Sequence, residues 1–515
     1  MRPPLGPLAH GHFILAAALA ILCVLVAAPL HRLVVAEERA PVLPPPAPTV
    51  IGINLFGLDT FNRQQVFANL VAQSVWFSSR DGGWTEMPAS QLDRLGWVRH
   101  LELGQTAPRP LILPPAPFRP IEVRCEFSGT GELSAGGVAR VRESSGQMLL
   151  LDVEPTGAEG EGAWIELLST DAADPLREID CRDSSLPRKE RFHPEFLAFL
   201  DGFRVIRFLD WQRVNDNLPV SWEGRTLPAS GSQAGRTGAS IEDMVALANR
   251  IGSDPWFLMP YRADETYIRQ FAELVHEQLD PRRTVYIEFG NEIWNDLFDA
   301  ARQAKREGLS LGLGGGDPVR AQALRYAQQH VRVMRVWTEV FADRPRQLVR
   351  VAAAHNANPQ IAELILNEGE TARWTDALAT APYAWMDMEG YEREDVDAVF
   401  AAMPEAIADA LAFAAQNRAT AVRHGKRFIA YEGGQHLVPE DLELARAVQR
   451  DARMERVYAQ YITAWQERMG DALVLYASTA PISQHGSWGL REYAGQPDAE
   501  APKLRAVRMA LKARR

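Results

Sequence analysis

Short apolar runs alternate with amphipathic segments over most of the chain. After residue 196, seven runs have the length and apolar character of buried strands, and an eighth run at 50–55 precedes them. Strands that alternate with helices form a parallel sheet covered by helices, and eight such strands can close a barrel. The pattern therefore predicts an α/β chain that folds as a (β/α)8 TIM barrel. The later strands are predicted at 203–211, 256–261, 285–289, 348–353, 377–381, 427–431 and 473–477.

Apolar residues at helical spacing separate the predicted strands. Similar spacing at 61–74 predicts a helix directly after the first strand. A doubly wound open sheet is the main rival fold, and it needs a glycine-rich turn at that point. Gly57-Leu58-Asp59 does not supply this turn, and the glycine run 312–316 follows a helix, as is typical of a loop. The later helices are predicted at 241–251, 267–279, 321–341, 406–424 and 454–469.

The segment 108–182 has a different character. Proline is dense up to Pro120, and short β-like runs follow without a helical stretch between them. We therefore expect a small, β-rich, sandwich-like module inserted after the first strand. The predicted domains are a barrel at 50–107 and 183–515, the inserted module at 108–182, a Pro-rich tether at 37–49 and an N-terminal segment at 1–36.

The N-terminal segment contains one uninterrupted apolar run, residues 13–30, without a charged side chain. Its length of 18 residues lies between that of a signal-peptide core and that of a membrane span. The sequence at 34–36 is an acceptable cleavage site, and the flanking charges do not separate a cleaved signal peptide from an uncleaved anchor. Both alternatives predict an exported protein, either periplasmic and attached to the inner membrane through 13–30, or secreted. A buried core helix is disfavoured, because the run lies at the extreme terminus before a Pro-rich stretch.

The chain has three cysteines, and Cys23 lies inside the apolar run. Cys125 and Cys181 lie near the two ends of the inserted module. In an exported protein such a pair is expected to be oxidised. We predict a disulfide between them that closes a loop of about 56 residues.

Composition and charge narrow the possible partners. The formal net charge is −11, so no basic surplus is available to neutralise phosphates, and we expect no nucleic-acid partner. Thirteen tryptophans suit a saccharide site, because sugar rings stack on indole, although large barrels also bury many tryptophans. No cofactor or metal is predicted, since His355, His436 and His485 lack a ligand spacing such as His-Glu-x-x-His. His355 is instead expected to be a hydrogen-bonding neighbour of the site.

Polar side chains follow the predicted strands, and barrel enzymes carry their reactive groups at the C-terminal ends of strands. Glu292 follows the fourth strand and Glu432 follows the seventh, so we expect them to face each other across the barrel mouth. A retaining glycosidase needs two carboxyl groups about 5–5.5 Å apart, one to attack the anomeric carbon and one to protonate the leaving oxygen. An ionised partner should raise the pKa of Glu292, as in a coupled pair.

Further residues at the strand ends are candidates for substrate binding. Asn291 can hold the sugar 2-hydroxyl, a contact that strengthens in the transition state. Tyr383 can donate to Glu432 within about 3.2 Å, and Arg207 supplies a nearby positive charge. The candidate stacking platforms for sugar rings are Trp211, Trp294, Trp385 and Trp488.

The sequences 290–292 (Gly-Asn-Glu) and 431–434 (Tyr-Glu-Gly-Gly) resemble the strand-four and strand-seven motifs of clan A glycoside hydrolases. Residues 50–490 also resemble a group of bacterial secreted proteins described as carbohydrate-binding or glycoside-hydrolase-like. The resemblance implies a retaining hydrolase of a β-linked polysaccharide or exopolysaccharide, with Glu292 as acid/base and Glu432 as nucleophile. It also implies supporting parts for Asn291, Arg207, Tyr383 and Trp488. The Gly-Gly-Gln-His sequence after Glu432 departs from most clan members, so subsite details do not carry over.

Other interpretations stay open on the sequence alone. Both glutamates could be surface carboxylates, and Arg207 could simply pair inside the barrel with Glu288 or Asp210. The aromatic candidates could serve packing alone. A non-catalytic exported polysaccharide-binding protein on the same barrel is the main functional alternative, because a fold does not fix an activity. A transglycosylase would form the same covalent intermediate and pass the sugar to another sugar.

Overall fold

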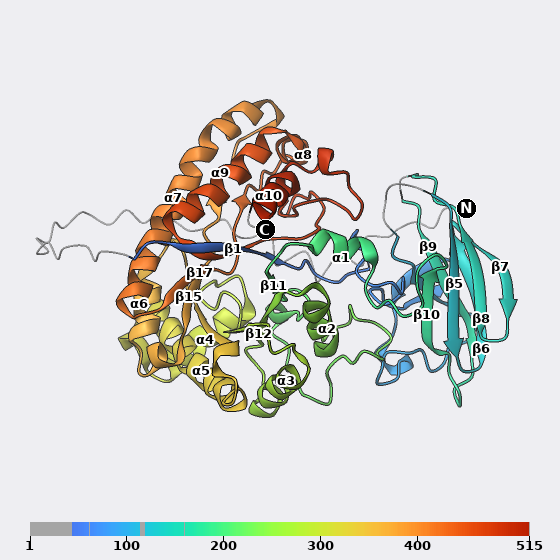
Figure 1. Cartoon of the computed structure of the whole chain (residues 1–515). Coiled ribbons are helices and arrows are strands. Elements are labelled where there is room, and N and C mark those ends of the chain that lie inside the picture. The colour runs from blue at the N-terminus through green and yellow to red at the C-terminus, as the bar shows by residue number, and fades with distance from the viewer. Residues whose placement is uncertain (1–43, 61, 114–118, 159, 514–515) are drawn as a thin grey trace, which may run out of the picture.

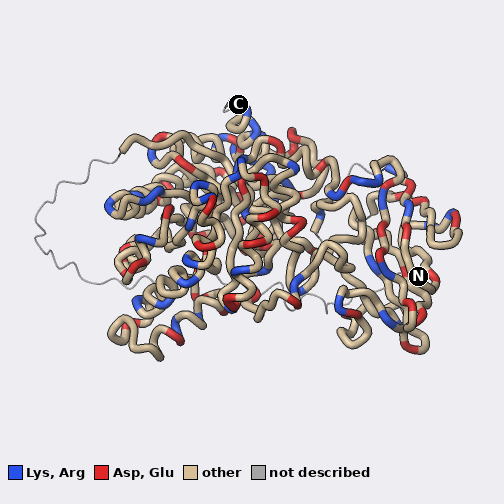
Figure 2. Tube along the Cα trace, turned by 60° about the horizontal axis from the view of Figure 1, so that its bottom comes forward, with Lys and Arg blue, Asp and Glu red and all other residues tan. Residues whose placement is uncertain are grey.

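The computed structural model describes residues 44–513 apart from residues 61, 114–118 and 159. The predicted signal peptide or anchor, with its apolar run 13–30, lies outside the described residues. Figure 1 shows a helix-covered barrel on the left and a group of strands on the right, with helix α1 between them. Basic and acidic residues are interspersed along the trace of both parts (Figure 2).

Eight parallel strands form a closed barrel, which confirms the predicted fold. The first strand closes the ring, because Ile53 lies opposite Ile206 on one side and Leu475 on the other. The strands at 285–289 and 348–353 have the predicted bounds. The barrel strands are β1 (Ala47–Asn54), β11 (Val205–Arg207), β12 (Asp254–Met259), β13 (Val285–Phe289), β14 (Leu348–Ala353), β15 (Ala377–Thr380), β17 (Arg427–Ala430) and β19 (Gly470–Leu475).

Helices form the outer layer around the barrel (Figure 1). Side-chain caps fix where some of them begin: Ser240 accepts a hydrogen bond from the Asp243 N–H, and Asp264 accepts one from the Tyr267 N–H. The helices are α1 (Pro194–Leu200), α2 (Ile241–Ile251), α3 (Glu265–Gln278), α4 (Asp299–Ser310), α5 (Pro318–Val340), α6 (Pro359–Asn367), α7 (Val396–Arg423), α8 (Leu442–Arg450), α9 (Arg453–Arg468) and α10 (Pro502–Lys512).

One helical stretch in the described part of the chain, Arg393–Arg423, is long and apolar enough to cross a membrane by length and composition. Helix α7 lies within this stretch and packs against β15 and β17. Its apolar residues, among them Met403 and Leu411, belong to the core between the barrel and its helices. The composition of α7 is therefore explained by its place in the barrel.

Alternate residues of the barrel strands point into the barrel, as the period of two in a strand requires. Trp256 and Tyr286 stack there, with ring centroids 5.3 Å apart. The same alternation directs Arg207, two residues after the inward Val205, and Glu288, two residues after Tyr286, into the interior. Both side chains are fully buried. The register of the strands thus places two opposite charges inside the barrel.

The long insertion after β1 folds into two antiparallel sheets with their own core, as predicted for a β-rich insertion. One sheet has the order β10-β5-β8-β7 and the other the order β4-β9-β6. A small hairpin, β2 (Phe77–Arg80) and β3 (Gly83–Glu86), precedes them. The strands of the two sheets are β4 (Ala107–Pro110), β5 (Ile121–Ser128), β6 (Gly131–Gly137), β7 (Ala139–Ser145), β8 (Met148–Val153), β9 (Ala163–Thr170) and β10 (Arg177–Asp183).

Cys125 and Cys181 form a disulfide, as predicted. The two residues lie directly opposite each other on β5 and β10, with their Cα atoms 3.9 Å apart. Both are fully buried in the core of the insertion. A structural disulfide of this kind is typical of proteins in oxidising compartments.

The helix predicted at 61–74 is wrong: the described residues of this segment form an irregular loop with a turn, and Phe67 forms an isolated bridge with Phe192. The apolar spacing serves two cores instead of one helix face, because Val66 and Phe67 pack on the barrel side and Leu70 and Val71 pack in the insertion. The side chain of Gln73 fixes the turns by accepting a hydrogen bond from the Val66 N–H at 3.1 Å. The helix that follows β1 in the barrel is α1, on the far side of the insertion.

Candidate active site

Arg207 is at the centre of a buried hydrogen-bond network at the C-terminal end of the barrel. Its guanidinium donates to Glu288 Oε2 at 2.9 Å and to Glu432 Oε1 at 2.8 Å. It also donates to the side-chain oxygens of Asn54 at 3.0 Å and Asn291 at 2.9 Å. Four strands therefore contribute to one cluster, either directly or through the residues that follow them. The sequence left two parts open for Arg207, an ion pair inside the barrel and a positive charge near Glu432. It has both, since it pairs with Glu288 inside the barrel and with Glu432 at the mouth.

Glu432 follows β17 and is held by two donors on different oxygens. Arg207 donates to Oε1, and the Tyr383 hydroxyl donates to Oε2 at 2.9 Å, within the distance expected from the sequence. Only 6% of the residue is exposed. Burial raises the pKa of Glu432 above its ordinary value, and the charge of Arg207 opposes that rise. The two donors direct the carboxylate and leave it few alternative orientations.

Glu292 occupies an unusual backbone conformation, with φ at +45°. A non-glycine residue in the left-handed region is uncommon, and such residues concentrate at functional sites. Gly290, two residues earlier, also has a positive φ, and a Cβ there would approach Ile293 to 2.6 Å. The turn formed by these residues brings the Glu292 side chain back over the end of the barrel.

The Glu292 carboxyl is hydrogen-bonded on both oxygens. The Tyr431 hydroxyl donates to Oε1 at 3.1 Å, and the Asn295 amide donates to Oε2 at 2.9 Å. Burial, followed by the negative charge of Glu432, raises the pKa of Glu292 to about 7. The direction agrees with the expectation for a coupled pair of carboxyl groups. At neutral pH Glu292 is therefore able both to donate and to accept a proton.

Asn291 is buried and uses both ends of its amide. Its oxygen accepts from Arg207, and its Nδ2 donates to the side-chain oxygen of Asn215 at 3.0 Å. Asn215 belongs to the long loop between β11 and α2. The amide of Asn291 is thereby fixed between the barrel and that loop.

Asp210 is a further carboxyl group at the site, and the sequence suggested it only as a possible partner for Arg207. The Tyr476 hydroxyl donates to its Oδ2 at 3.0 Å. Burial, and then the charge of Glu432, raises the pKa of Asp210 to about 7. The signal in the sequence was its position three residues after Arg207, at the end of the second barrel strand.

Four carboxyl groups thus surround one arginine: Asp210, Glu288, Glu292 and Glu432. Buried negative charges repel one another, so a single guanidinium cannot stabilise all four in their ionised form. Glu288 and Glu432 contact Arg207 directly, and ionisation is most favourable there. Asp210 and Glu292 therefore keep their protons below about pH 7, in line with their raised pKa values.

Aromatic rings line the side of the site next to Glu432. His436 lies between Tyr383 and Trp488, with ring centroids 5.4 Å and 5.6 Å away, and Trp488 also contacts Tyr476 at 5.9 Å. Trp488 lies over Gly486, where an added Cβ would approach the indole to 2.1 Å. The structure thus places the predicted Tyr383 against Glu432, and Trp488 belongs to the same aromatic group through His436 and Tyr476.

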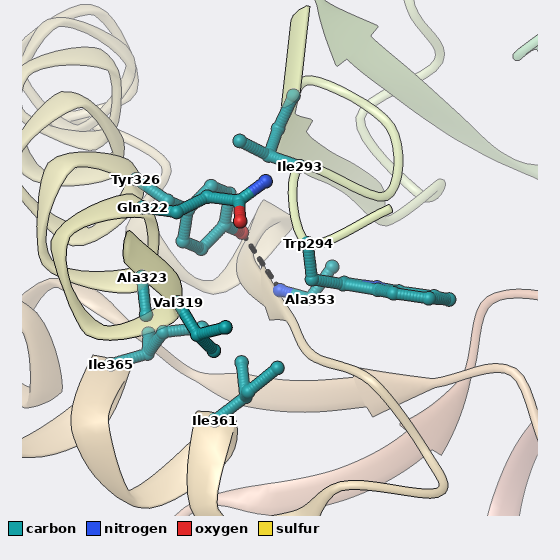
Figure 3. Close-up of a pocket in the computed structure, with 9 residues that line it drawn as sticks. All are labelled: Ile293, Trp294, Val319, Gln322, Ala323, Tyr326, Ala353, Ile361 and Ile365. Carbon is teal, nitrogen blue, oxygen red and sulfur yellow. Dashed lines mark hydrogen bonds between the residues drawn. The ribbon is translucent and has the colours of Figure 1, made fainter. Parts of the chain in front are cut away.

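Trp294 and His355 lie together at the ends of β13 and β14. Their rings stack at 3.9 Å with an interplanar angle of 8°. Burial lowers the pKa of His355 to about 4, so the imidazole is neutral at ordinary pH. Figure 3 shows a small apolar pocket beside Trp294, with side chains of α5 and α6 around it, among them Tyr326, whose hydroxyl accepts from the Ala353 N–H at 2.8 Å. At about 10 Å³, this pocket is too small to hold a sugar ring.

Two further tryptophans were predicted to be stacking platforms for sugar rings. The prediction is wrong for Trp211, whereas Trp385 is half-exposed beside the site. Trp211 is fully buried, because its ring packs among Phe67, Phe196 and Phe208 at centroid distances of 5.5–6.3 Å. It has no free face for a sugar. Trp385 lies on β16 (Ala384–Trp385), which pairs with β18 (Gln435–His436) next to the site, and half of its surface is exposed.

Several residues of the site were not predicted from the sequence as site residues. Asn54, Glu288 and Tyr431 are inward-facing residues at or near strand ends, and strand alternation alone would have selected them. Asn215 lies in the β11–α2 loop and Tyr476 directly follows β19, and only the folded chain brings them together at the site. Within the described part of the chain, no group of three His, Cys, Asp or Glu side chains has a metal-binding arrangement.

Comparison with known proteins gives similarities of fold. No protein-family model and no curated protein sequence matches the chain. Among solved structures, the GH51 arabinofuranosidase from Xanthomonas axonopodis pv. citri has 15% identity and a TM-score of 0.36, over 59% of this chain and 63% of that chain, which is less than two thirds of its length. A Bacteroidetes-affiliated GH5 cellulase has 12% identity and a TM-score of 0.35, over 62% of this chain and 82% of its own.

A β-glucosidase from Thermotoga maritima has 11% identity and a TM-score of 0.30, over 62% of this chain and 84% of its own. The chain is thus structurally similar to (β/α)8-barrel glycoside hydrolases at low sequence identity.

Proposed function

We propose that this protein is a retaining glycoside hydrolase that acts on a β-linked polysaccharide or exopolysaccharide. The observation that supports the proposal best is the unequal setting of the two glutamates. Glu432 is oriented by Arg207 and Tyr383, whereas Glu292 contacts neutral donors and has its pKa raised to about 7. Two carboxyl groups with different settings suit the two parts of this chemistry, a nucleophile and a proton donor.

In the first step, a Glu432 oxygen attacks the anomeric carbon while the bond to the leaving oxygen breaks. Glu292 gives its proton to that oxygen, and the products are a glycosyl ester on Glu432 and an ionised Glu292. Formation of the ester removes the negative charge of Glu432, which lowers the pKa of Glu292. In the second step, Glu292 takes a proton from water, the water oxygen attacks the anomeric carbon, and Glu432 leaves as a carboxylate.

The surroundings suit a polysaccharide. Trp488, Trp294 and the half-exposed Trp385 offer aromatic surface near the carboxyl groups, on which sugar rings stack. The disulfide and the apolar run 13–30 support an exported location, periplasmic or secreted. Hydrolysis and transglycosylation share the first step, and the acceptor in the second step separates them.

The full chain, purified from an exporting host, should release reducing ends from at least one member of a panel of β-linked polysaccharides that includes the exopolysaccharide of the producing organism. Glu432→Ala should lower that rate by at least about 10⁴-fold, because the covalent step is lost, and should still bind the polysaccharide. A wild-type protein that binds polysaccharide without cleaving or transferring any would contradict the proposal and favour a binding protein. Products longer than the substrate would indicate transglycosylation.

A further inference from the structure

A second cavity opens beside the candidate site, on the same end of the barrel. It has a volume of about 310 Å³ and lies between the β11–α2 loop and the start of α3. Its lining includes Arg213 and Arg236 from the loop and Tyr267 from α3. A cavity of this volume approaches the size of small-molecule sites.

The two arginines of the cavity differ in whether they are paired. Arg213 donates to Asp216 at 2.7 Å and is mostly buried. Arg236 is exposed and forms no hydrogen bond or ion pair within the described residues. The chain carries an excess of 11 negative charges, so most arginines can find a carboxylate, and one that lies unpaired at a cavity is available to an anionic ligand.

Tyr267 adds a second polar group to the lining. Only 8% of the residue is exposed, and its ring packs against Phe271. Within the described part of the chain, no hydrogen-bond partner is present for its hydroxyl group. The hydroxyl oxygen keeps access to solvent and Tyr267 lines the cavity, so a ligand in the cavity can form a hydrogen bond with it.

One loop connects the cavity with the carboxyl cluster. Arg213 and Val214 line the cavity, and the next residue, Asn215, accepts a hydrogen bond from Asn291. Asn291 in turn contacts Arg207. A ligand in the cavity therefore contacts Val214, and the next residue in the chain, Asn215, is hydrogen-bonded to the candidate catalytic network through Asn291.

We propose that this cavity is a subsite for a sugar unit that bears a carboxylate, which makes the substrate an acidic polysaccharide. The proposal rests on the proposed glycosidase function and specifies its substrate class. Arg236 binds the carboxylate, and Tyr267 binds a hydroxyl group of the same sugar. An acidic sugar gains an ion pair with Arg236 and a neutral sugar does not, so the subsite favours the acidic chain.

Binding to the full chain carrying Glu432→Ala tests the subsite apart from catalysis. The probes are a hyaluronan hexasaccharide, whose alternate units are uronates, and cellohexaose as the neutral probe, each measured by calorimetry at low and high salt. Arg236→Gln should weaken binding of the acidic probe at least about fivefold and reduce its salt dependence, without an effect on the neutral one. Arg346→Gln is the matched control, because Arg346 is exposed, also lacks a partner within the described residues, and precedes β14 at the opposite end of the barrel.

Tighter binding of the acidic probe that depends on Arg236 and not on Arg346 supports the subsite. Equal binding of both probes, an equal effect of both arginine substitutions, or no binding of the acidic probe would overturn it. The proposed function fails separately, if the wild-type protein neither cleaves nor transfers any polysaccharide of the panel described above.

Discussion

Two fully buried arginines, one in the barrel and one at the base of the insertion, show how the same residue serves chemistry in one place and architecture in the other. Arg207 contacts two carboxylates, Glu288 and Glu432. Arg109 on β4 contacts no carboxylate within the described residues. It donates to the backbone oxygens of Val71 and Ser74, and to that of Gly231 in the β11–α2 loop.

The surroundings shift the two guanidinium groups in opposite directions. Burial, without a neighbouring negative charge, lowers the pKa of Arg109 to about 9. Glu288 and Glu432 outweigh the effect of burial on Arg207 and raise its pKa. The rings of Trp76 and Trp97 lie 5.2 Å and 5.6 Å from the Arg109 guanidinium and complete its setting. Arg109 thus joins the insertion to a barrel loop, whereas Arg207 gathers the negative charge that the proposed reaction uses.

Substitution of each arginine by methionine tests the difference between Arg207 and Arg109 most directly. It also has the largest expected effect on turnover and stability. Arg207→Met should lower turnover by about 10³-fold, because Glu432 loses its orienting charge, and should cost about 3–5 kcal/mol of stability, because Glu288 stays buried and unpaired. Arg109→Met should cost about 1–3 kcal/mol, since several carbonyl groups lose a donor, and should leave kcat unchanged. Denaturant unfolding and initial rates on the cleaved polysaccharide measure both. Similar losses of kcat in the two variants would show that the distinction is wrong.

Removal of the disulfide tests in a second way whether the insertion serves architecture and the barrel serves chemistry. We expect an effect of intermediate size, on stability alone. A Cys125→Ser/Cys181→Ser double variant should lose about 4 kcal/mol of stability, because the loop of 56 residues is no longer closed in the unfolded chain. The sulfur atoms lie in the core of the insertion, so kcat should not change at temperatures where the variant is folded. Thermal unfolding together with kcat checks the result. A large fall in kcat of the folded variant would mean that the insertion takes part in the chemistry.

The sequence predicted the barrel well because its signals are local. Strand length and helical spacing located the strands at 285–289 and 348–353 and the helix at 241–251 to the residue. The segment 61–74 was misinterpreted because its apolar residues divide between two cores, a property of the tertiary structure. For the same reason the sequence could not distinguish Trp211, enclosed by three phenylalanines, from Trp488, which packs against His436 and Tyr476. Strand alternation directs Asn54 and Glu288 into the barrel, but their meeting at Arg207 depends on strand register, which no local pattern reveals.

A further prediction concerns the pH dependence of the rate. Glu292 must carry a proton for the first step, and its pKa is raised to about 7, so kcat/KM should fall as the pH rises above about 7, approaching tenfold per pH unit. Glu292→Ala should remove this alkaline limb for aryl glycosides with good leaving groups, because they need little protonation. On natural polysaccharide the same variant should lose about 10²–10⁴-fold. Rate profiles over a range of pH decide the matter, and equal losses on both substrates would argue against Glu292 as the proton donor.

The central claim, that Glu432 forms a covalent bond with the sugar and Glu292 handles the proton, is tested most directly by trapping. Once the panel has identified the sugar, the matching 2-deoxy-2-fluoro glycoside with an activated leaving group should label the wild-type protein with one sugar. The fluorine slows both steps and the good leaving group restores the rate of the first step only, so the glycosyl ester accumulates. Peptide mass spectrometry should place that sugar on Glu432, with no label in Glu432→Ala. A label on Glu292 or Asp210, or full turnover of the natural substrate with inverted stereochemistry and no label, would contradict the account.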